Sequence, residues 1–96
     1  MELVIVSPVR TLYSGDAEEV SLPGTIGRFT VLPGHAPLIS SLEEGDITYT
    51  SLGRRTTLAV KRGCVRILND RIEACVETAG NPVAGNTAAG QGKEQR

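Results

Sequence analysis

The chain has 96 residues, with ten basic and eleven acidic side chains, a formal net charge of −1 and only 3% aromatic residues. This is the length of one domain, and its core must be built from Val, Ile, Leu and Ala. The balanced charge gives no basis for nucleic-acid binding through a basic face. No segment approaches the roughly 20 apolar residues of a membrane helix, so we expect no direct membrane insertion.

Short apolar runs with period-two alternation follow one another from Glu2 to Val76, separated by glycine and proline turns. Many short strands at this spacing, without helical periodicity, predict an all-β fold, an antiparallel β-sandwich or barrel. The expected strands lie near Leu3–Ser7, Arg10–Tyr13, Ala17–Leu22, Gly27–Leu32, Pro37–Leu42, Asp46–Ser51, Thr56–Lys61, Gly63–Leu68 and Arg71–Val76.

The stretch from Leu22 to Leu38 consists of turn chemistry around short apolar strands. Pro23-Gly24 and Pro33-Gly34 are turn dipeptides. They predict two rigid loops presented as a binding surface. His35 is the sole histidine, but its neighbours supply no nucleophile or acid, so we expect no catalytic residue, cofactor or metal site here.

The last two strands form the clearest hairpin. Asn69 and Asp70 make a plausible two-residue turn, because Asn and Asp tolerate positive φ. Closing this turn pairs Leu68 with Arg71 and fixes the register of the rest. The pairs that follow are Ile67–Ile72, Arg66–Glu73, Val65–Ala74 and Cys64–Cys75. One face of the hairpin is then apolar, and the other carries an opposite-charge pair.

In this register Cys64 and Cys75 occupy a hydrogen-bonded pair, where Cα atoms lie about 5.5 Å apart. That distance permits a disulfide, but the Cβ vectors suit one poorly. Two cysteines are also too few for a disulfide scaffold, and we expect a cytosolic protein. We therefore favour two packed, reduced thiols.

The character of the chain changes at Thr78. The remainder contains four glycines and a proline and almost nothing large to bury, so it cannot recover the entropy lost on ordering. We therefore expect a sandwich domain over residues 1–78 and a flexible glycine-rich tail over residues 79–96.

The stretch Leu22–Leu38 resembles the signature of epsilon subunits of F-type ATP synthases, V-x-L-P-G-x-x-G-x-F-G-I-L-P-G-H-A-P-L. The resemblance extends from about Leu3 to Glu77, with matches of similar order and spacing at Ile5–Pro8, Leu12–Gly15, Leu42–Ile47 and Gly63–Ile67. Two positions depart from the usual glycine of the family, Thr30 and Arg62.

This resemblance implies a sandwich of about ten strands at the foot of the central stalk. The expected function is that of a non-catalytic rotor subunit of a proton- or sodium-translocating ATP synthase, coupling the gamma subunit to the c-ring. It would be a monomer within a hetero-oligomeric complex, peripheral to the cytoplasmic side of a bacterial inner membrane. Many family members continue with a helical hairpin that inhibits ATP hydrolysis, and we expect a short form without it.

The resemblance also implies two sets of contact residues. The set expected to meet the c-ring is Thr25, Ile26, Gly27, Arg28 and Phe29. The set expected to meet gamma is Ser7, His35 and Ser40. The Arg28 guanidinium could pair with a carboxylate or carbonyl oxygen of the ring loops.

Two other functions remain open on the residues alone. One is a small adaptor sandwich that binds a peptide or carbohydrate through its loops, although few aromatic side chains are available for stacking on sugars. The other is a minor enzyme using His35, which lacks a catalytic constellation.

Overall fold

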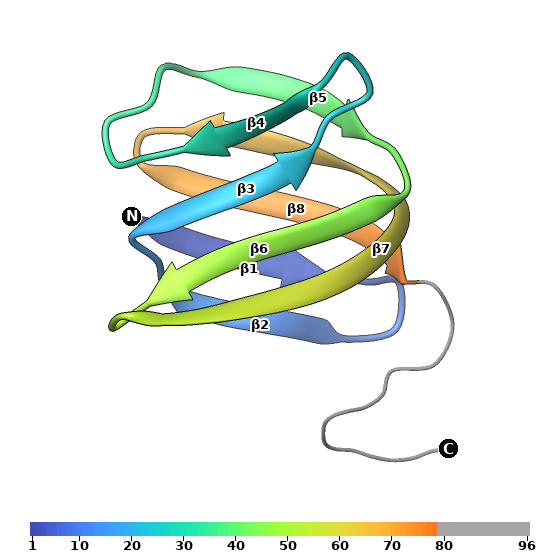
Figure 1. Ribbon diagram of the computed structural model, residues 1–96, viewed down its shortest axis with the longest axis horizontal. Coiled ribbons are helices and arrows are strands. Elements are labelled where there is room, and N and C mark those ends of the chain that lie inside the picture. Colours follow the sequence, from blue (N-terminus) through green and yellow to red (C-terminus); the bar gives the residue numbers. More distant parts are fainter. Residues whose placement is uncertain (79–96) are drawn as a thin grey trace.

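A computed structural model describes residues 1–78, which form eight strands and no helix (Figure 1). The strands are β1 (Glu2–Val6), β2 (Thr11–Asp16), β3 (Glu19–Pro23), β4 (Arg28–Val31), β5 (Leu38–Leu42), β6 (Gly45–Ser51), β7 (Arg54–Leu68) and β8 (Arg71–Thr78). The all-β prediction is confirmed. The tail expected over residues 79–96 lies outside the described residues.

The strands form two layers that share β7 (Figure 1). The front layer contains β4, β3, β6 and the first half of β7, and the back layer contains β5, the second half of β7, β8, β1 and β2. Every strand pair is antiparallel except β1 with β8, which is parallel. The fold is therefore the expected antiparallel sandwich with one parallel pair.

The strand count is eight, whereas about ten were expected, chiefly because two predicted strands are one. Thr56–Lys61 and Gly63–Leu68 both belong to β7, which runs without a break. A bulge lies between Val60 and Arg62 in the pairing with β8, and Lys61 and Arg62 are both exposed. The extra residue shifts the inward-facing positions and bends the strand, so that β7 passes from the front layer to the back layer.

Gly63 permits the bend because β7 and β8 approach very closely there. A Cβ atom at this position would overlap the Cys75 carbonyl oxygen and lie 3.0 Å from the Val76 Cα atom. Glycine inside a strand often marks such a close backbone approach. The Arg62-Gly63 sequence therefore marks a bend within one strand and not a turn between two.

The β7–β8 hairpin has the predicted turn and register. Asn69 and Asp70 have φ values of 51° and 63°, the positive values that the two-residue turn requires. All five predicted pairs are present, from Leu68 with Arg71 to Cys64 with Cys75. The prediction for this hairpin is confirmed in full.

The space between the layers is filled by aliphatic side chains, each of which stabilises the fold by about 1.5–3 kcal/mol when fully buried. Among the described residues, no polar or charged side chain is buried. The Tyr13 and Tyr49 rings pack with centroids 4.4 Å apart, and burial raises the pKa of the Tyr49 phenol. The largest fully buried side chains are Leu3, Ile5, Leu22, Ile47, Ile67 and Ile72.

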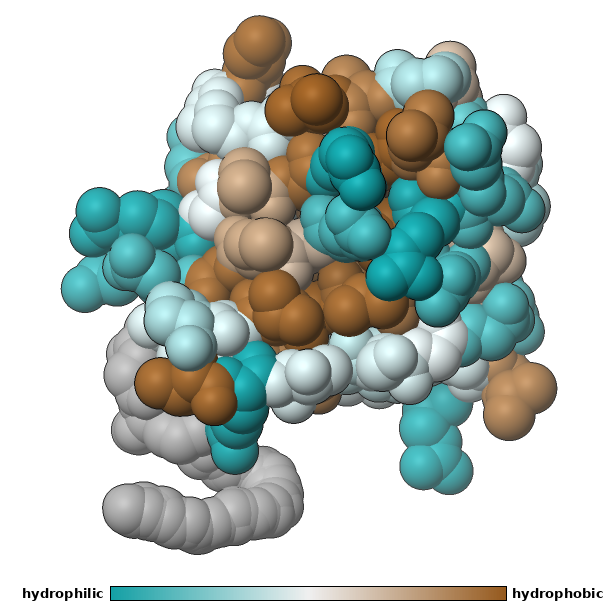
Figure 2. Space-filling view, turned by 180° about the vertical axis from the view of Figure 1, so that it is seen from behind, coloured by the Kyte–Doolittle hydropathy of each residue, from teal (hydrophilic) through white to brown (hydrophobic). Residues whose placement is uncertain are grey.

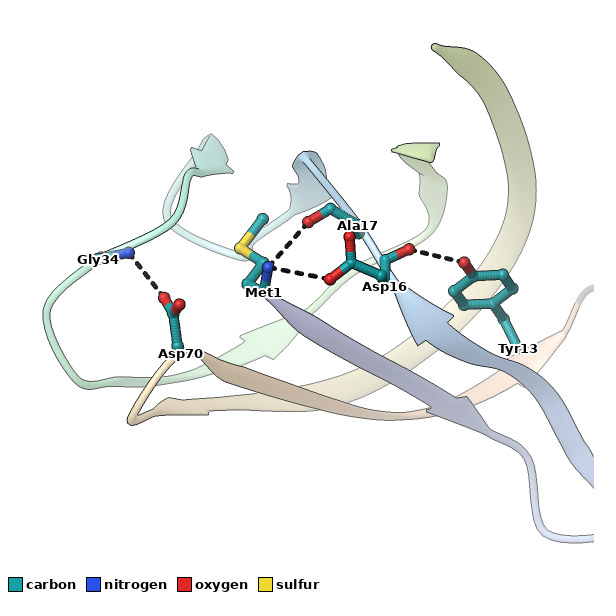
Figure 3. Close-up of polar contacts among 6 residues, drawn as sticks. All are labelled: Met1, Tyr13, Asp16, Ala17, Gly34 and Asp70. Atoms are coloured by element: carbon teal, nitrogen blue, oxygen red, sulfur yellow. Dashed lines mark hydrogen bonds and ion pairs between the residues drawn. The ribbon is translucent and has the colours of Figure 1, made fainter. Parts of the chain in front are cut away.

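Hydrogen bonds join the layers along their edges. Near one edge, the Met1 nitrogen donates to the Ala17 carbonyl at 3.2 Å, and the Ala17 nitrogen donates back to Met1 at 2.8 Å. Beside this junction and within β2, the Tyr13 hydroxyl donates to the Asp16 carbonyl at 2.8 Å (Figure 3). At the other edge, an isolated bridge joins Gly24 to Leu42. The layers are thus linked on both sides and form a closed, rigid body.

Candidate docking surface

The five residues expected to meet a c-ring lie in the β3–β4 turn, which holds Thr25, Ile26 and Gly27, and at the start of β4, which holds Arg28 and Phe29. A hydrogen bond of 3.0 Å from the Gly27 nitrogen to the Gly24 carbonyl closes the turn. A Cβ atom on Gly24 would lie 2.8 Å from the Gly27 oxygen and 2.9 Å from the Phe29 ring, so only glycine fits at this corner. The turn is therefore fixed by its own backbone and by the Phe29 ring behind it.

Ile26 forms the tip of this turn and is fully exposed, with a relative accessibility of 101%. Behind it, the Thr25 hydroxyl lies 2.8 Å from the Ser41 hydroxyl, and the Thr25 nitrogen donates to the Ser41 carbonyl at 3.1 Å. Phe29 points the other way and packs against the core. The turn thus presents one apolar side chain on a base that is anchored to β5.

Arg28 stands beside the tip on the front layer. Its Nη2 donates to the Asp46 carbonyl on β6 at 2.7 Å. This bond holds the guanidinium in place. Because the side chain is exposed, the other N–H groups of its planar fork can donate to a partner. Arg28 is therefore preorganised by its own protein for a further acceptor.

Two neighbouring turns share this end of the sandwich (Figure 1). The Glu43 nitrogen donates to the Pro23 carbonyl at 2.9 Å, which places the β5–β6 turn against the β3–β4 turn. The β1–β2 turn carries Val9, which is 86% exposed. We call these three turns the tip surface, comprising residues 7–10, 24–27 and 43–44. It combines exposed aliphatic side chains with acidic and basic ones.

The residues expected to meet gamma are not brought together. Ser7 lies at the tip surface, where its hydroxyl accepts from the Arg10 nitrogen and donates to the Arg10 carbonyl, both at 3.2 Å. His35 lies at the other end of the sandwich. Its neighbour Gly34 binds Asp70, and the Asp70 carbonyl accepts from the Glu2 nitrogen at the start of β1. Ser7 follows the end of β1, so a five-residue strand, about 17 Å long, separates the two.

His35 is held by a loop that a distant turn fixes in place. The Asp70 carboxylate accepts from the Gly34 nitrogen at 2.7 Å (Figure 3). The His35 nitrogen donates to the Leu32 carbonyl at 3.1 Å, and its ring Nδ1–H donates to the Ala36 carbonyl at 2.7 Å. The ring is thus used locally, and among residues 1–78 no cluster of three or more His, Cys, Asp or Glu side chains could hold a metal ion.

Ser40 lies on β5 and pairs with buried Val65, so its side chain is on the inner side of the back layer. Its hydroxyl donates to the Ser41 carbonyl at 3.0 Å. Sequence reasoning did not identify Asp70, Asp46 and Ser41 as the residues that fix the two loops. No sequence signal links them to their partners, which are 16 to 36 residues away.

The outer face of the back layer carries a row of charges across its strands. Arg71 contacts Glu2 at 2.6 Å and Glu73 at 2.8 Å, and Arg66 contacts Glu73 at 2.9 Å. The hydrogen bond from Arg71 lowers the pKa of the Glu73 carboxyl, and Glu2 and Glu73 together raise the pKa of Arg71. Figure 2 shows this face, with hydrophilic side chains gathered between hydrophobic ones. The face could accept a partner of mixed chemistry.

Comparison with known proteins identifies the class to which this sandwich belongs. The protein-family model of the ATP synthase Delta/Epsilon chain, β-sandwich domain, matches residues 1–82. The chain therefore belongs to this family, and the resemblance noted in its sequence is confirmed. No helix in the described part of the chain is long and apolar enough to span a membrane.

Two relatives show the extent of the match. The ATP synthase epsilon chain of Geobacter sulfurreducens is 35% identical over 79 residues, which are 82% of this chain and 57% of the relative. That of Koribacter versatilis is 36% identical over 95 residues, 99% of this chain and 67% of the relative. The chain thus spans little more than half the length of several relatives it matches.

Two solved structures share the fold. One is a chain of the Euglena gracilis mitochondrial ATP synthase, in an OSCP/F1/c-ring assembly, with a TM-score of 0.73 and 13% identity over 77% of this chain and 48% of the other. The second is a chain of the Tetrahymena thermophila central stalk and c-ring, with a TM-score of 0.71 and 13% identity over 92% of this chain and 77% of the other. At this identity the likeness concerns the fold alone.

Proposed function

We propose that this chain is a non-catalytic rotor subunit of an F-type ATP synthase that joins the gamma subunit to the c-ring. The observation that carries the proposal is the family match over residues 1–82, which includes the whole sandwich and its tip surface. The two structural neighbours come from an OSCP/F1/c-ring assembly and from a central stalk with c-ring, which supports the same setting. The protein would then be peripheral to the cytoplasmic side of a bacterial inner membrane, held there by its partners.

The proposed role is mechanical and needs a rigid body. Torque passes without slippage only if the sandwich does not shear, and β7 resists shear because it belongs to both layers. The bridge from Gly24 to Leu42 and the bonds between Met1 and Ala17 hold the edges. The coupling ion, H⁺ or Na⁺, is a property of the c-ring.

In this proposal the β3–β4 turn rests on the polar loops of the c-ring. Ile26 is the anchor, because a fully exposed aliphatic side chain at a rigid tip loses its contact with water when a partner covers it. Arg28 supplies a charge already positioned by the Asp46 carbonyl. Ser7, His35 and Ser40 remain the residues proposed for gamma, spread along the back layer from one end to the other.

The test is co-purification of gamma and the c-ring with the tagged full chain, in wild type and variants. We expect Ile26→Ser to weaken binding to the c-ring about tenfold, equivalent to about 1.4 kcal/mol. Arg28→Glu should change it by about 0–1 kcal/mol, and only at low salt. Leu52→Ser is the matched control, because Leu52 is 93% exposed in the β6–β7 turn at the opposite end. A wild-type chain that retains neither gamma nor the c-ring contradicts the proposal.

A further inference from the structure

Cys64 and Cys75 form a thiol pair on the outer face of the back layer. They are directly opposite each other on β7 and β8, and both are free and exposed. The packed thiols expected from the sequence are therefore surface thiols. On the neighbouring strands, Val6 of β1 lies beside Cys75 and Ser41 of β5 lies beside Cys64. Two nucleophilic groups thus stand side by side where reagents in solvent reach them.

The pair forms part of the lining of an open groove of about 620 Å³. Its walls include Val6, Pro8 and Leu42, and the ion pair Arg62–Glu77, with 3.4 Å between Nε and Oε1, lies at its rim. The groove is large enough for a peroxide or a small disulfide to reach either sulfur. Access therefore does not limit chemistry at these thiols.

The register determines what the two sulfurs can do. The two-residue turn makes Leu68 with Arg71 a hydrogen-bonded pair, and the alternation makes Cys64 with Cys75 another. Cα atoms at such a pair lie about 5.5 Å apart, within the range of about 4.4–6.8 Å found in disulfides. At hydrogen-bonded pairs in general, the Cβ atoms lie near the upper end of about 4.5–5.5 Å, whereas relaxed disulfides have about 3.5–4.5 Å. A bond can close here, but only under strain.

Strained and exposed disulfides are the ones that reducing systems open readily. A bond between these sulfurs would also add little to the fold, because the hairpin already holds β7 against β8. Its effect would be local, at the groove and beside the bend at Gly63. These properties suit a reversible modification rather than a permanent crosslink.

We propose that Cys64 and Cys75 are a reversible dithiol–disulfide site, oxidised by hydrogen peroxide or by a low-molecular-weight disulfide. With peroxide, one thiolate attacks an oxygen to give a sulfenic acid and water. The second thiol then attacks the sulfenic sulfur and releases a second water. Overall, the two thiols lose two electrons and two protons, and the peroxide becomes two waters. With a small disulfide, successive thiolate attacks release two small thiols.

The test treats the full chain with hydrogen peroxide or oxidised glutathione and measures free thiols and mass. We expect a monomer that has no free thiol and whose mass is lower by that of two hydrogen atoms. We expect thioredoxin or excess reduced glutathione to restore both thiols. Cys64→Ser and Cys75→Ser are matched controls that keep the fold, checked by urea unfolding. Each should instead retain glutathione as a stable adduct, with at least a tenfold slower loss of that adduct.

Three results overturn the proposal. Wild-type protein that keeps both thiols, or carries two glutathiones, shows that the sulfurs do not reach each other. Oxidation only to dimers shows that each thiol reacts with another chain. Thiols that are protected until a chelator is added hold a metal and not each other. The site does not depend on the proposed rotor function, so failure of either leaves the other standing.

Discussion

The two outer faces of the sandwich have different surface chemistry on similar strands. On the front layer, hydroxyls line up across four strands, from Thr30 through Ser21 and Thr48 to Thr57. On the back layer, Arg71 and Glu73 lie at the centre of the charged row, with the thiol pair in the row beside it. Except for the pair between the Met1 nitrogen and Asp16 at an edge, all ion pairs among the described residues lie on the back face.

This difference shows that strand pairing leaves the outer faces free for other roles. Both layers obtain their stability from the shared apolar interior, to which each strand contributes its inward residues. The outer residues are constrained only by their cross-strand neighbours, which here select hydroxyls on one face and opposite charges on the other. Substitutions should therefore affect stability strongly where the two layers join and weakly on either face.

The largest effect is expected at Gly63, where β7 leaves one layer for the other. Gly63→Ala forces a Cβ into the Cys75 carbonyl, so β7 and β8 must separate. We expect a loss of about 1–3 kcal/mol in the free energy of unfolding, measured with urea. The neighbouring change Cys64→Ala is the control and should stay within about 0.5 kcal/mol. Equal stability of the two variants contradicts the close approach.

A somewhat smaller loss is expected at Asp70, which serves the turn and the loop that holds His35. Asp70→Ala removes the acceptor of the Gly34 nitrogen and places an alanine at a φ of 63°. Together these should cost about 1–2 kcal/mol, again measured by urea unfolding, because the lost hydrogen bond is exposed to water. Asp70→Asn keeps an acceptor oxygen and tolerates positive φ, so it should be close to wild type. An asparagine variant as unstable as the alanine variant would show that the charge, and not the hydrogen bond, is what matters.

The charged row of the back face predicts a pH dependence. The pKa of Glu73 is lower in the folded chain than its ordinary value of 4.5, because Arg71 donates to it. The stabilisation is therefore complete above the ordinary value and is lost as the pH falls through the lower, folded value. Melting temperatures of wild type and Glu73→Gln should differ at neutral pH and converge below about pH 4. A constant difference down to pH 2 would exclude this carboxylate as the cause.

The smallest effect is expected on the front face. Thr48→Val replaces a half-buried hydroxyl by a methyl group on β6 without touching the interior. We expect a change within about 0.5 kcal/mol, with no dependence on pH, in the same unfolding experiment. A pH-dependent change at Thr48 would remove the contrast between the two faces.

The sequence by itself determined the features that depend on neighbours along the chain. Alternation of apolar residues is enough to predict the strands and the interior. The chemistry of Asn69 and Asp70 is enough to fix the register of the last hairpin, down to the facing cysteines. The Leu22–Leu38 pattern identified the family, because turn residues at fixed spacing are set by local backbone geometry.

Only the tertiary structure decided how these elements meet. Arg62-Gly63 has the composition of a turn, and nothing local shows that β8 holds the chain extended there and bends it. The bonds from Asp70 to Gly34 and from Arg28 to Asp46 join residues far apart in the chain, so no periodicity predicts them. The exposure of both thiols follows from the same cause. Which face of a strand is covered depends on packing between layers, and alternation alone shows only that the two faces differ.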